Sequence, residues 1–261
     1  MTSLRIFAVG GLISFRALFG FMSPWIFVPT LVVTPLFQIL LFAYIGRSAG
    51  IQDDAFYVVG NAIQYAAVPC LFAMTFTIAG ERFNQTLGPI LVSPARRLPL
   101  FLGRSVPVIV NGAFVAALSF LLGSLVLDVE VPGSAIAPLA LVIVLASASC
   151  TGLGLVLAGI GLRVREQAVM LNIVFGLLLV FTGANVPVDE LPAWMEATSR
   201  LLPFTHAIEA ARELVAGGTL DAVSGLLVRE LAIGAVYAVL GYAFLRFMER
   251  QGRVHATLEK V

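Results

Sequence analysis

The stretch IAPLALVIVLASASCTGLGLVLAGI, residues 136–160, decides the fold class, because it runs for 25 residues without Asp, Glu, Lys or Arg. The hydrocarbon core of a bilayer is about 30 Å thick, and a helix needs about 20 apolar residues to cross it. This stretch is therefore long enough and apolar enough to form a transmembrane helix.

The rest of the chain has a matching composition. Of its 261 residues, 59% are hydrophobic and 12% are charged, whereas soluble domains are about 45–50% apolar and about 25% charged. A soluble fold of this size leaves roughly a quarter of its unfolded surface in water, so lipid is the solvent expected for the excess. The net charge is +1 and no Lys/Arg-rich run is present, so no nucleic-acid partner is expected.

Gaps between the charged residues predict an all-α membrane protein with six transmembrane helices, in a single transmembrane domain over residues 1–261. The sixth helix has the shortest charge-free core, 231–245. Arg229 and Glu230 are therefore expected near one membrane interface and Arg246 near the other. Snorkelling of Arg229 and Arg246, or an Arg229–Glu230 end that faces protein, would compensate for the short span. The predicted spans are approximately residues 25–45, 55–79, 105–127, 136–160, 168–187 and 229–246.

Basic residues fall mainly on one side of these spans. Twelve of the 16 Lys and Arg residues lie in the N-terminal segment, the loops 81–104 and 163–166, and the C-terminal tail. The positive-inside rule places these segments in the cytoplasm, which predicts a multi-pass protein of the bacterial cytoplasmic membrane with both termini inside. The start of the chain is apolar only between Arg5 and Arg16, too short to cross, and is interpreted as a retained in-plane interfacial helix.

The first candidate functional region is the cytoplasmic loop GERFNQTLGPILVSPARRLPLFLGR, Gly80–Arg104. Residues 86–91 favour a short helix, which Ser93-Pro94 would end. A short helix below the membrane, flanked by Arg96 and Arg97, suits the docking of a cytoplasmic partner. A plain connecting loop fits the same residues equally well.

The second candidate region is the external segment 186–229. It contains two helical patterns separated by Pro203, and the second pattern ends at Gly217-Gly218. These helices are expected to re-enter the membrane or to lie at its outer leaflet. His206 and Glu209 are three residues apart, which allows an ion-binding or catalytic role, but an interfacial polar face is the favoured interpretation.

The sequence carries no catalytic or metal-binding motif of the common kinds. It has no G-x-x-x-x-G-K-[ST], no G-x-S-x-G and no H-E-x-x-H. Cys70 and Cys150 lie in apolar segments without C-x-x-C spacing, and His206 and His255 share no ligand spacing, so no metal site is predicted. No carboxylate, Lys or His is expected in the middle of a span, which disfavours ion-coupled transport.

Small residues recur in the fourth span, where Ala148, Gly152, Gly154 and Ala158 follow small-xxx-small spacing. Such spacing lets helix backbones approach closely in lipid. The pattern fits a seam between helices or between subunits, and general membrane packing is the favoured interpretation.

Three patterns in the predicted loops resemble the type-two ABC exporter permease family, which includes drug, antibiotic, nodulation-factor and polysaccharide exporters. The resemblance extends in order along the whole chain, and is closest to the daunorubicin-resistance type. The sequence departs from the family pattern at Gln85 and Gly88. The patterns are E-R-x-x-x-T-L-x-x-x-L-x-S-P-x-x-R from Glu81 to Arg97, G-x-x-x-P-x-x-x-L-P-x-W from Gly183 to Trp194, and L-P-F-T-x-x-I-E-x-x-R from Leu202 to Arg212.

The resemblance implies a coupling helix between the second and third spans and short re-entrant helices before the sixth. It also implies assembly of two permeases, as copies or paralogues, with ATP-binding-cassette subunits that bind ATP and Mg, so that this chain holds no cofactor. The contact with the ATPase subunit would use Glu81, Arg82, Thr86, Leu87, Ile90, Leu91, Ser93, Pro94, Arg96 and Arg97, with Arg163, Arg165 and Glu166 as a second contact. The external re-entrant region would use Pro187, Leu191, Pro192, Trp194, Pro203, Glu209 and Arg212.

The function expected from the resemblance is export of an amphipathic drug-, antibiotic- or lipid-like substrate, with ATP hydrolysed on a separate subunit. Two alternatives stay open. A membrane assembly or sensor subunit would have no partner ATPase, and an ion-coupled carrier would work without ATP. An intramembrane enzyme is the least favoured, because the middles of the predicted spans carry no catalytic group.

Overall fold

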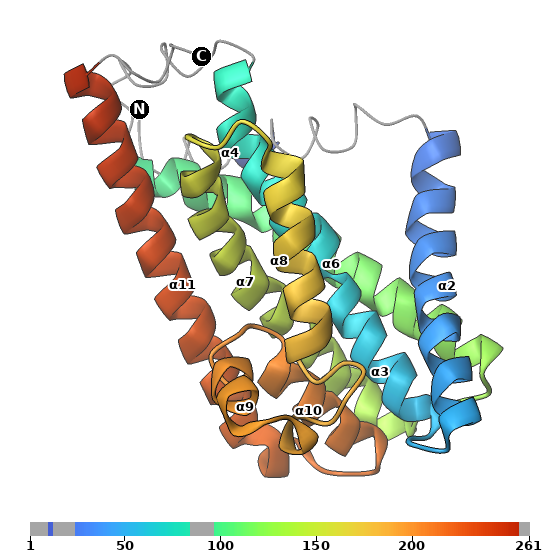
Figure 1. Ribbon diagram of the computed structural model, residues 1–261. Coiled ribbons are helices and arrows are strands. Elements are labelled where there is room, and N and C mark those ends of the chain that lie inside the picture. Colours follow the sequence, from blue (N-terminus) through green and yellow to red (C-terminus); the bar gives the residue numbers. More distant parts are fainter. Residues whose placement is uncertain (1–9, 13–23, 84–96, 256–261) are drawn as a thin grey trace.

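The computed structural model describes residues 10–12, 24–83 and 97–255, and every regular element in these ranges is helical (Figure 1). The all-α membrane class is thus confirmed. The predicted in-plane helix before residue 24 lies outside the described residues except for 10–12, which are helical. The predicted coupling helix at 86–91 lies outside them entirely.

Long helices that alternate in direction form the bundle (Figure 1). Three short helices, η3 (Val188–Glu190), α9 (Ala193–Ser199) and α10 (Thr205–Val215), gather at one end, which we call the α10 end. The long elements are α2 (Pro24–Ala49), α3 (Asp54–Tyr65) continued by η1 (Val68–Ala73) and α4 (Met74–Phe83), α6 (Arg97–Val126), α7 (Ile136–Gly161, after the single turn η2 at Gly133–Ala135), α8 (Gln167–Phe181) and α11 (Leu220–His255).

Five of these elements are long and apolar enough to cross a membrane, and α8 is a shorter apolar helix of 15 residues. The structure ends α8 at Phe181, six residues before the predicted limit of the fifth span, since Gly183 takes a left-handed conformation with φ of 78° and turns the chain. α11 begins at Leu220, nine residues before the predicted limit of the sixth span, and is the longest helix described. Charged residues near its start therefore lie within a continuous helix.

The second span is interrupted by a π-helix at its centre. Pro69 has no N–H, and its ring conflicts with the carbonyl four residues earlier, so the regular α-helical hydrogen bonding stops there. The wide turn fits against neighbouring helices through glycines. A Cβ on Gly154 of α7 would lie 2.5 Å from the Cys70 carbonyl oxygen, and one on Gly112 of α6 would lie 2.5 Å from the Cys70 sulfur.

α7 and α11 pack against each other through another glycine seam. A Cβ on Gly234 would lie 2.7 Å from Ser149 Cα, and one on Gly241 would lie 2.8 Å from Val156 N, so the two helices run in the same direction. The predicted seam in the fourth span is therefore a contact between helices of one chain. Extending this register along both helices places Glu230 beside Leu145 of α7. Leu145 lies nine residues after Ile136, the first residue of α7, which is about 14 Å along the helix axis.

α7 occupies the middle of the bundle, whereas α2 and α11 flank it (Figure 1). Two thirds of the most apolar part of α7 is buried, at 67%, compared with 22% for α2 and for α11. The outer faces of the flanking helices carry large apolar side chains, including Phe37, Leu41, Val236 and Val239. Such faces suit contact with lipid, where apolar exposure has no cost.

Candidate functional site

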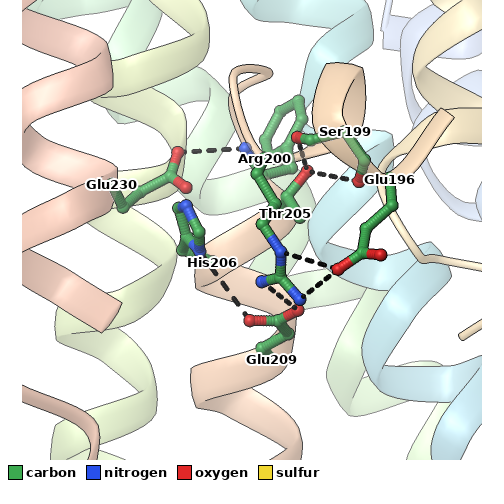
Figure 2. Close-up of polar contacts among 8 residues, drawn as sticks. Glu196, Ser199, Arg200, Thr205, His206, Glu209 and Glu230 are labelled. Carbon is green, nitrogen blue, oxygen red and sulfur yellow. Dashed lines mark hydrogen bonds and ion pairs between the residues drawn. The ribbon is translucent and has the colours of Figure 1, made fainter. Parts of the chain in front are cut away.

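Polar and charged side chains of the described residues gather at the α10 end, where residues 182–230 pack on the long helices. Figure 2 shows the largest group, which comes from α9, α10, α11 and the α9–α10 connection. Ser199, Thr205, His206 and Glu230 of this group are buried, whereas Glu196, Arg200 and Glu209 are partly exposed. They form the best-organised polar site in the described part of the chain.

Glu230 holds the start of α10 from another helix. Phe204 precedes α10 in a left-handed conformation, with φ of 79°, and has no side chain able to cap the helix. Its backbone N–H donates instead to Glu230 Oε1 at 2.9 Å. Glu230 is fully buried, at 0% exposure, and its second oxygen has no hydrogen-bond partner among the described residues.

This position of Glu230 corrects the expectation that it lies at a membrane interface. It is the eleventh residue of α11, inside the apolar segment Leu220–Met248. Ser149 of α7 faces the same carboxylate, and its hydroxyl also lacks a partner among the described residues. The described bundle thus contains a buried carboxylate ten residues after the start of the apolar segment that begins at Leu220.

A row of ionisable side chains leads from Glu230 towards the surface (Figure 2). The buried imidazole of His206 lies between the carboxylates of Glu230 and Glu209, with Nδ1 at 3.7 Å from Glu209 Oε2. Arg200 bridges Glu209, at 3.6 Å, and Glu196, at 3.2 Å. His206 is the main cause of a lowered pKa for Glu209, and Arg200 adds to it.

Arg212 anchors the last turn of α10. Its Nη2 donates to the carbonyl oxygens of Phe56 and Ala184, both at 3.1 Å, and the guanidinium carbon lies 3.4 Å from the centre of the Phe56 ring. Burial lowers the pKa of Arg212 to about 9, so the group stays charged at neutral pH. Gly60 leaves room for this arrangement, since a Cβ there would lie 2.7 Å from Arg212 Nη2.

A row of side-chain amides joins α2, α3 and the turn after α8. Gln38 Nε2 donates to the amide oxygens of Asn61 and Gln64, at 3.1 Å each. Asn61 Nδ2 donates to Asn185 Oδ1 at 2.9 Å. Hydrogen bonds of this kind hold helices together where no water competes.

An open cleft of about 510 Å³ lies between the start of α3, the α6–α7 loop and the end of α10. Its walls include the apolar side chains Phe56 and Val215, with Arg212 on one side and carboxylates on the others. Asp53 caps α3, and Asp54 pairs with Arg47. Two of the four acidic residues that line the cleft therefore have structural roles.

The external residues predicted from the sequence lie in this region, but only some of them meet. Glu209 and Arg212 share α10, and Pro203 lies buried in the connection before it. Pro187 and Pro192 precede η3 and α9, with Leu191 between these two helices. Trp194 is exposed on α9 and packs edge-on against Phe181, at 6.0 Å between ring centres.

The predicted cytoplasmic residues lie at the opposite end of the bundle. Glu81 and Arg82 are in the last turn of α4, and Arg97 is the first residue of α6. Arg163, Arg165 and Glu166 form the exposed α7–α8 turn, and Arg163 donates to Gln251 of α11. The other residues of the first contact lie outside the described residues: Thr86, Leu87, Ile90, Leu91, Ser93, Pro94 and Arg96.

Sequence reasoning missed the role of Glu230 and the amide row. A carboxylate beside an apolar run was the available signal for Glu230, but its partner is a backbone N–H, which no sequence pattern marks. Within residues 10–12, 24–83 and 97–255, no three His, Cys, Asp or Glu side chains are grouped to hold a metal ion. The hydrogen bonds of Glu230, Arg212 and Asn61 each join one helix to another element, so the arrangement fits the positioning of helices.

Known proteins are similar in sequence to most of this chain. It is 27% identical over 197 residues to the "Probable multidrug ABC transporter permease YbhR" of Escherichia coli K12, which covers 74% of this chain and 53% of that protein. The protein of the same name from Escherichia coli O157:H7 gives the same values. The chain thus spans about half the length of the curated relatives it matches.

The match to a family model over most of the chain decides the assignment. The model described as "ABC-2 type transporter" covers residues 8–215, which include every long helix except α11. The helical bundle and the apolar spans agree with a membrane subunit of this kind. The chain belongs to the ABC-2 type transporter family, as a membrane subunit of the permease type.

Proposed function

We propose that this chain exports an amphipathic drug-, antibiotic- or lipid-like substrate from the cytoplasm, with ATP hydrolysed by a separate ATP-binding-cassette subunit. The observation that carries the proposal is the family match over residues 8–215. The multidrug permease name of the relatives supports the substrate class. The sequence has no phosphate-binding loop of its own, which fits a motor on another chain.

The end of the bundle opposite α10 is assigned to the cytoplasm. The positive-inside distribution of Lys and Arg supports this orientation. The segment between α4 and α6, from Glu81 to Arg97, then faces the ATP-binding subunit, and the exposed Arg163–Glu166 turn adds a second contact. A second permease copy or a paralogue completes the translocation path. ATP and Mg belong to the motor subunit.

The helices α9 and α10 are assigned as a re-entrant pair. Glu230 lies about 14 Å along the α7 axis from Ile136, and Phe204 at the start of α10 contacts it. This register supports a turn between α9 and α10 deep in the outer leaflet. Irregular backbone at that depth is tolerated where protein groups satisfy it, and Glu230 does so for Phe204.

A second candidate function is favoured by one observation, the buried carboxylate of Glu230 within α11. Ionisable groups inside a span often serve ion-coupled carriers. In this chain, however, one oxygen of Glu230 is already used by Phe204 N. ATP-driven export therefore remains the first proposal.

Transport into inverted membrane vesicles separates the two functions. Vesicles containing the full chain and its co-purified ATP-binding subunit should accumulate a fluorescent amphipathic cation only when ATP and Mg are supplied. A variant motor with its phosphate-loop Lys replaced serves as the control and should give no accumulation. Uptake driven by a proton gradient without ATP would overturn the proposal in favour of the carrier.

A further inference from the structure

The helix α10 is held at its two ends by two different spans, each through one ionisable side chain. Its first turn is bound by Glu230 of α11, and its last turn carries Arg212, which binds the first turn of α3. The distance between these ends is the length of an 11-residue helix, about 16 Å.

The first end lacks a local cap, so Glu230 supplies one. Thr205 turns its hydroxyl away from the helix and donates to Ser199 O at 2.7 Å, which leaves the first backbone N–H groups without a side-chain acceptor of their own. Glu230 accepts from Phe204 N at 2.9 Å, and its carboxylate also faces the backbone N–H of Ala207. A carboxylate at a helix N-terminus is favourable electrostatically as well.

A second residue of α11 adds to the contact between α11 and the start of α10, which we call the joint. Tyr237 lies seven residues after Glu230, two helical turns along the same face of α11. Its hydroxyl donates to Leu201 O at 3.2 Å, in the α9–α10 connection. α11 in turn packs on α7 through Gly234 and Gly241, so the joint belongs to the α7–α11 pair.

The other end is fixed to the second span. Arg212 donates to Phe56 O in the first turn of α3 and to Ala184 O in the turn after α8, both at 3.1 Å. The guanidinium also stacks on the Phe56 ring. Hydrogen bonds from a charged donor in a largely buried site are stronger than neutral ones, so this end resists separation.

We propose that Glu230 and Arg212 are positioning residues that make α10 a strut between the last span and the second span. The proposal rests on the export function above, because the second span continues through η1 and α4 towards the segment expected to meet the motor. When the motor moves that segment, α10 carries the displacement to α11. Glu230 and Arg212 then act on transport without touching the substrate.

The cap is tested by hydrogen exchange on the purified full chain in lipid nanodiscs. Glu230→Leu should speed exchange of the amides 204–208 by about tenfold, the size of a lost helix cap, whereas Glu230→Gln keeps an acceptor oxygen and should change it by less than about threefold. Arg229→Gln is the matched control, since Arg229 is the exposed neighbour on α11. If the amides 204–208 exchange at the same rate in Glu230→Leu and in the unchanged protein, the proposal that Glu230 caps α10 is refuted.

A second variant keeps this test available if Glu230→Leu does not fold. Tyr237→Phe removes only the hydroxyl that binds Leu201 O, and should speed exchange in residues 201–205 by about threefold. Unchanged exchange in this variant would show that α11 does not hold the connection. These measurements need no substrate and no motor, so they remain decisive if export itself is not observed.

The link between the two ends is tested by transport with the motor subunit present. Glu230→Leu and Arg212→Met should each lower ATP-driven uptake by about tenfold while ATP hydrolysis falls by less than about twofold, because the joint acts after the motor. The double variant should be no worse than either single variant, since one broken end already disables a strut. If the losses of ATP-driven uptake in the two single variants multiply in the double variant, the proposal that α10 acts as a strut is refuted. Absence of ATP-driven uptake in the unchanged protein would instead refute the proposed function.

Discussion

Replacing Gly234 by Ala should loosen the α7–α11 seam and destabilise the bundle. The new Cβ would lie 2.7 Å from Ser149 Cα and 3.0 Å from Ser149 Cβ, whereas carbon atoms at ordinary contact are about 3.5–4.0 Å apart. Both atoms belong to the centre of a packed helix, so the side chain has no rotation that relieves the clash. The two helices must separate by about 1 Å at this point.

The energy follows from two opposing effects. Overpacking of this size costs about 1–3 kcal/mol, and Ala gains up to about 1 kcal/mol over Gly in helix propensity. The expected net change in the free energy of unfolding is a loss of about 1–2 kcal/mol. Gly225 provides the control on the same helix, because a Cβ there meets nothing within 4 Å, so Gly225→Ala should be neutral or slightly stabilising.

The assay is reversible unfolding of the purified chain in mixed micelles, with increasing SDS and with helix content followed by circular dichroism. Gly152→Ala should act like Gly234→Ala, because its Cβ would lie 2.8 Å from Gly234 O. The double variant should lose less than the two single losses together, since helices already separated have room for the second methyl group. If the Gly234→Ala protein is as stable as the Gly225→Ala protein, the close packing of α7 and α11 at Gly234 is refuted.

Three further predictions concern the charged site and the motor contact. Arg212→Met should lower the free energy of unfolding by about 2–3 kcal/mol in the same assay, because the Phe56 and Ala184 carbonyls lose a charged donor. His206 holds the pKa of Glu209 below its usual value. The stabilisation from Glu209 is therefore present above about pH 4.3 and is lost as the pH falls through the lower, folded-state pKa. The free energy of unfolding measured against pH should show this loss, and Glu209→Gln should flatten the pH dependence. Replacing residues 86–91 by a flexible Gly/Ser linker should leave membrane insertion intact and abolish stimulation of the partner's ATP hydrolysis.

Each of these has a control or a contrary outcome. Glu213→Gln changes an exposed carboxylate on the same helix as Arg212 and should leave stability unchanged within about 0.5 kcal/mol. If Glu209→Gln shows the same acid profile as the unchanged protein, another group is responsible for it. Full stimulation of ATP hydrolysis by the 86–91 linker variant would remove that segment from the motor contact.

The helical class and the approximate places of the spans follow from charge-free gaps, because lipid excludes charge from long helical segments. The same rule misjudged the start of the last helix. Arg229 and Glu230 are adjacent, but successive residues on a helix point about 100° apart, so Arg229 faces outward while Glu230 faces the protein. A count of charges along the chain cannot separate these two directions.

The sequence predictions named residues that lie on one helix, and they missed contacts whose partners are distant in the sequence. Glu209 and Arg212 of α10 were named because the family pattern from Leu202 to Arg212 contains both of them. Glu230 binds a backbone N–H 26 residues away, and Asn61 binds Asn185 across 124 residues. These contacts arise from how the helices pack, which spacing along the sequence does not reveal.

The shortness of α8 affects how the protein sits among lipids. Fifteen residues extend about 22 Å, about 8 Å less than the acyl region of a typical bilayer. A bare helix of this length would force the membrane to thin around it. In this chain Thr182 donates to Leu178 O, and Arg212 donates to the Ala184 carbonyl in the turn after α8. With that carbonyl oxygen satisfied by protein rather than by water, the turn would extend the buried length beyond Phe181 and reduce hydrophobic mismatch without a longer helix.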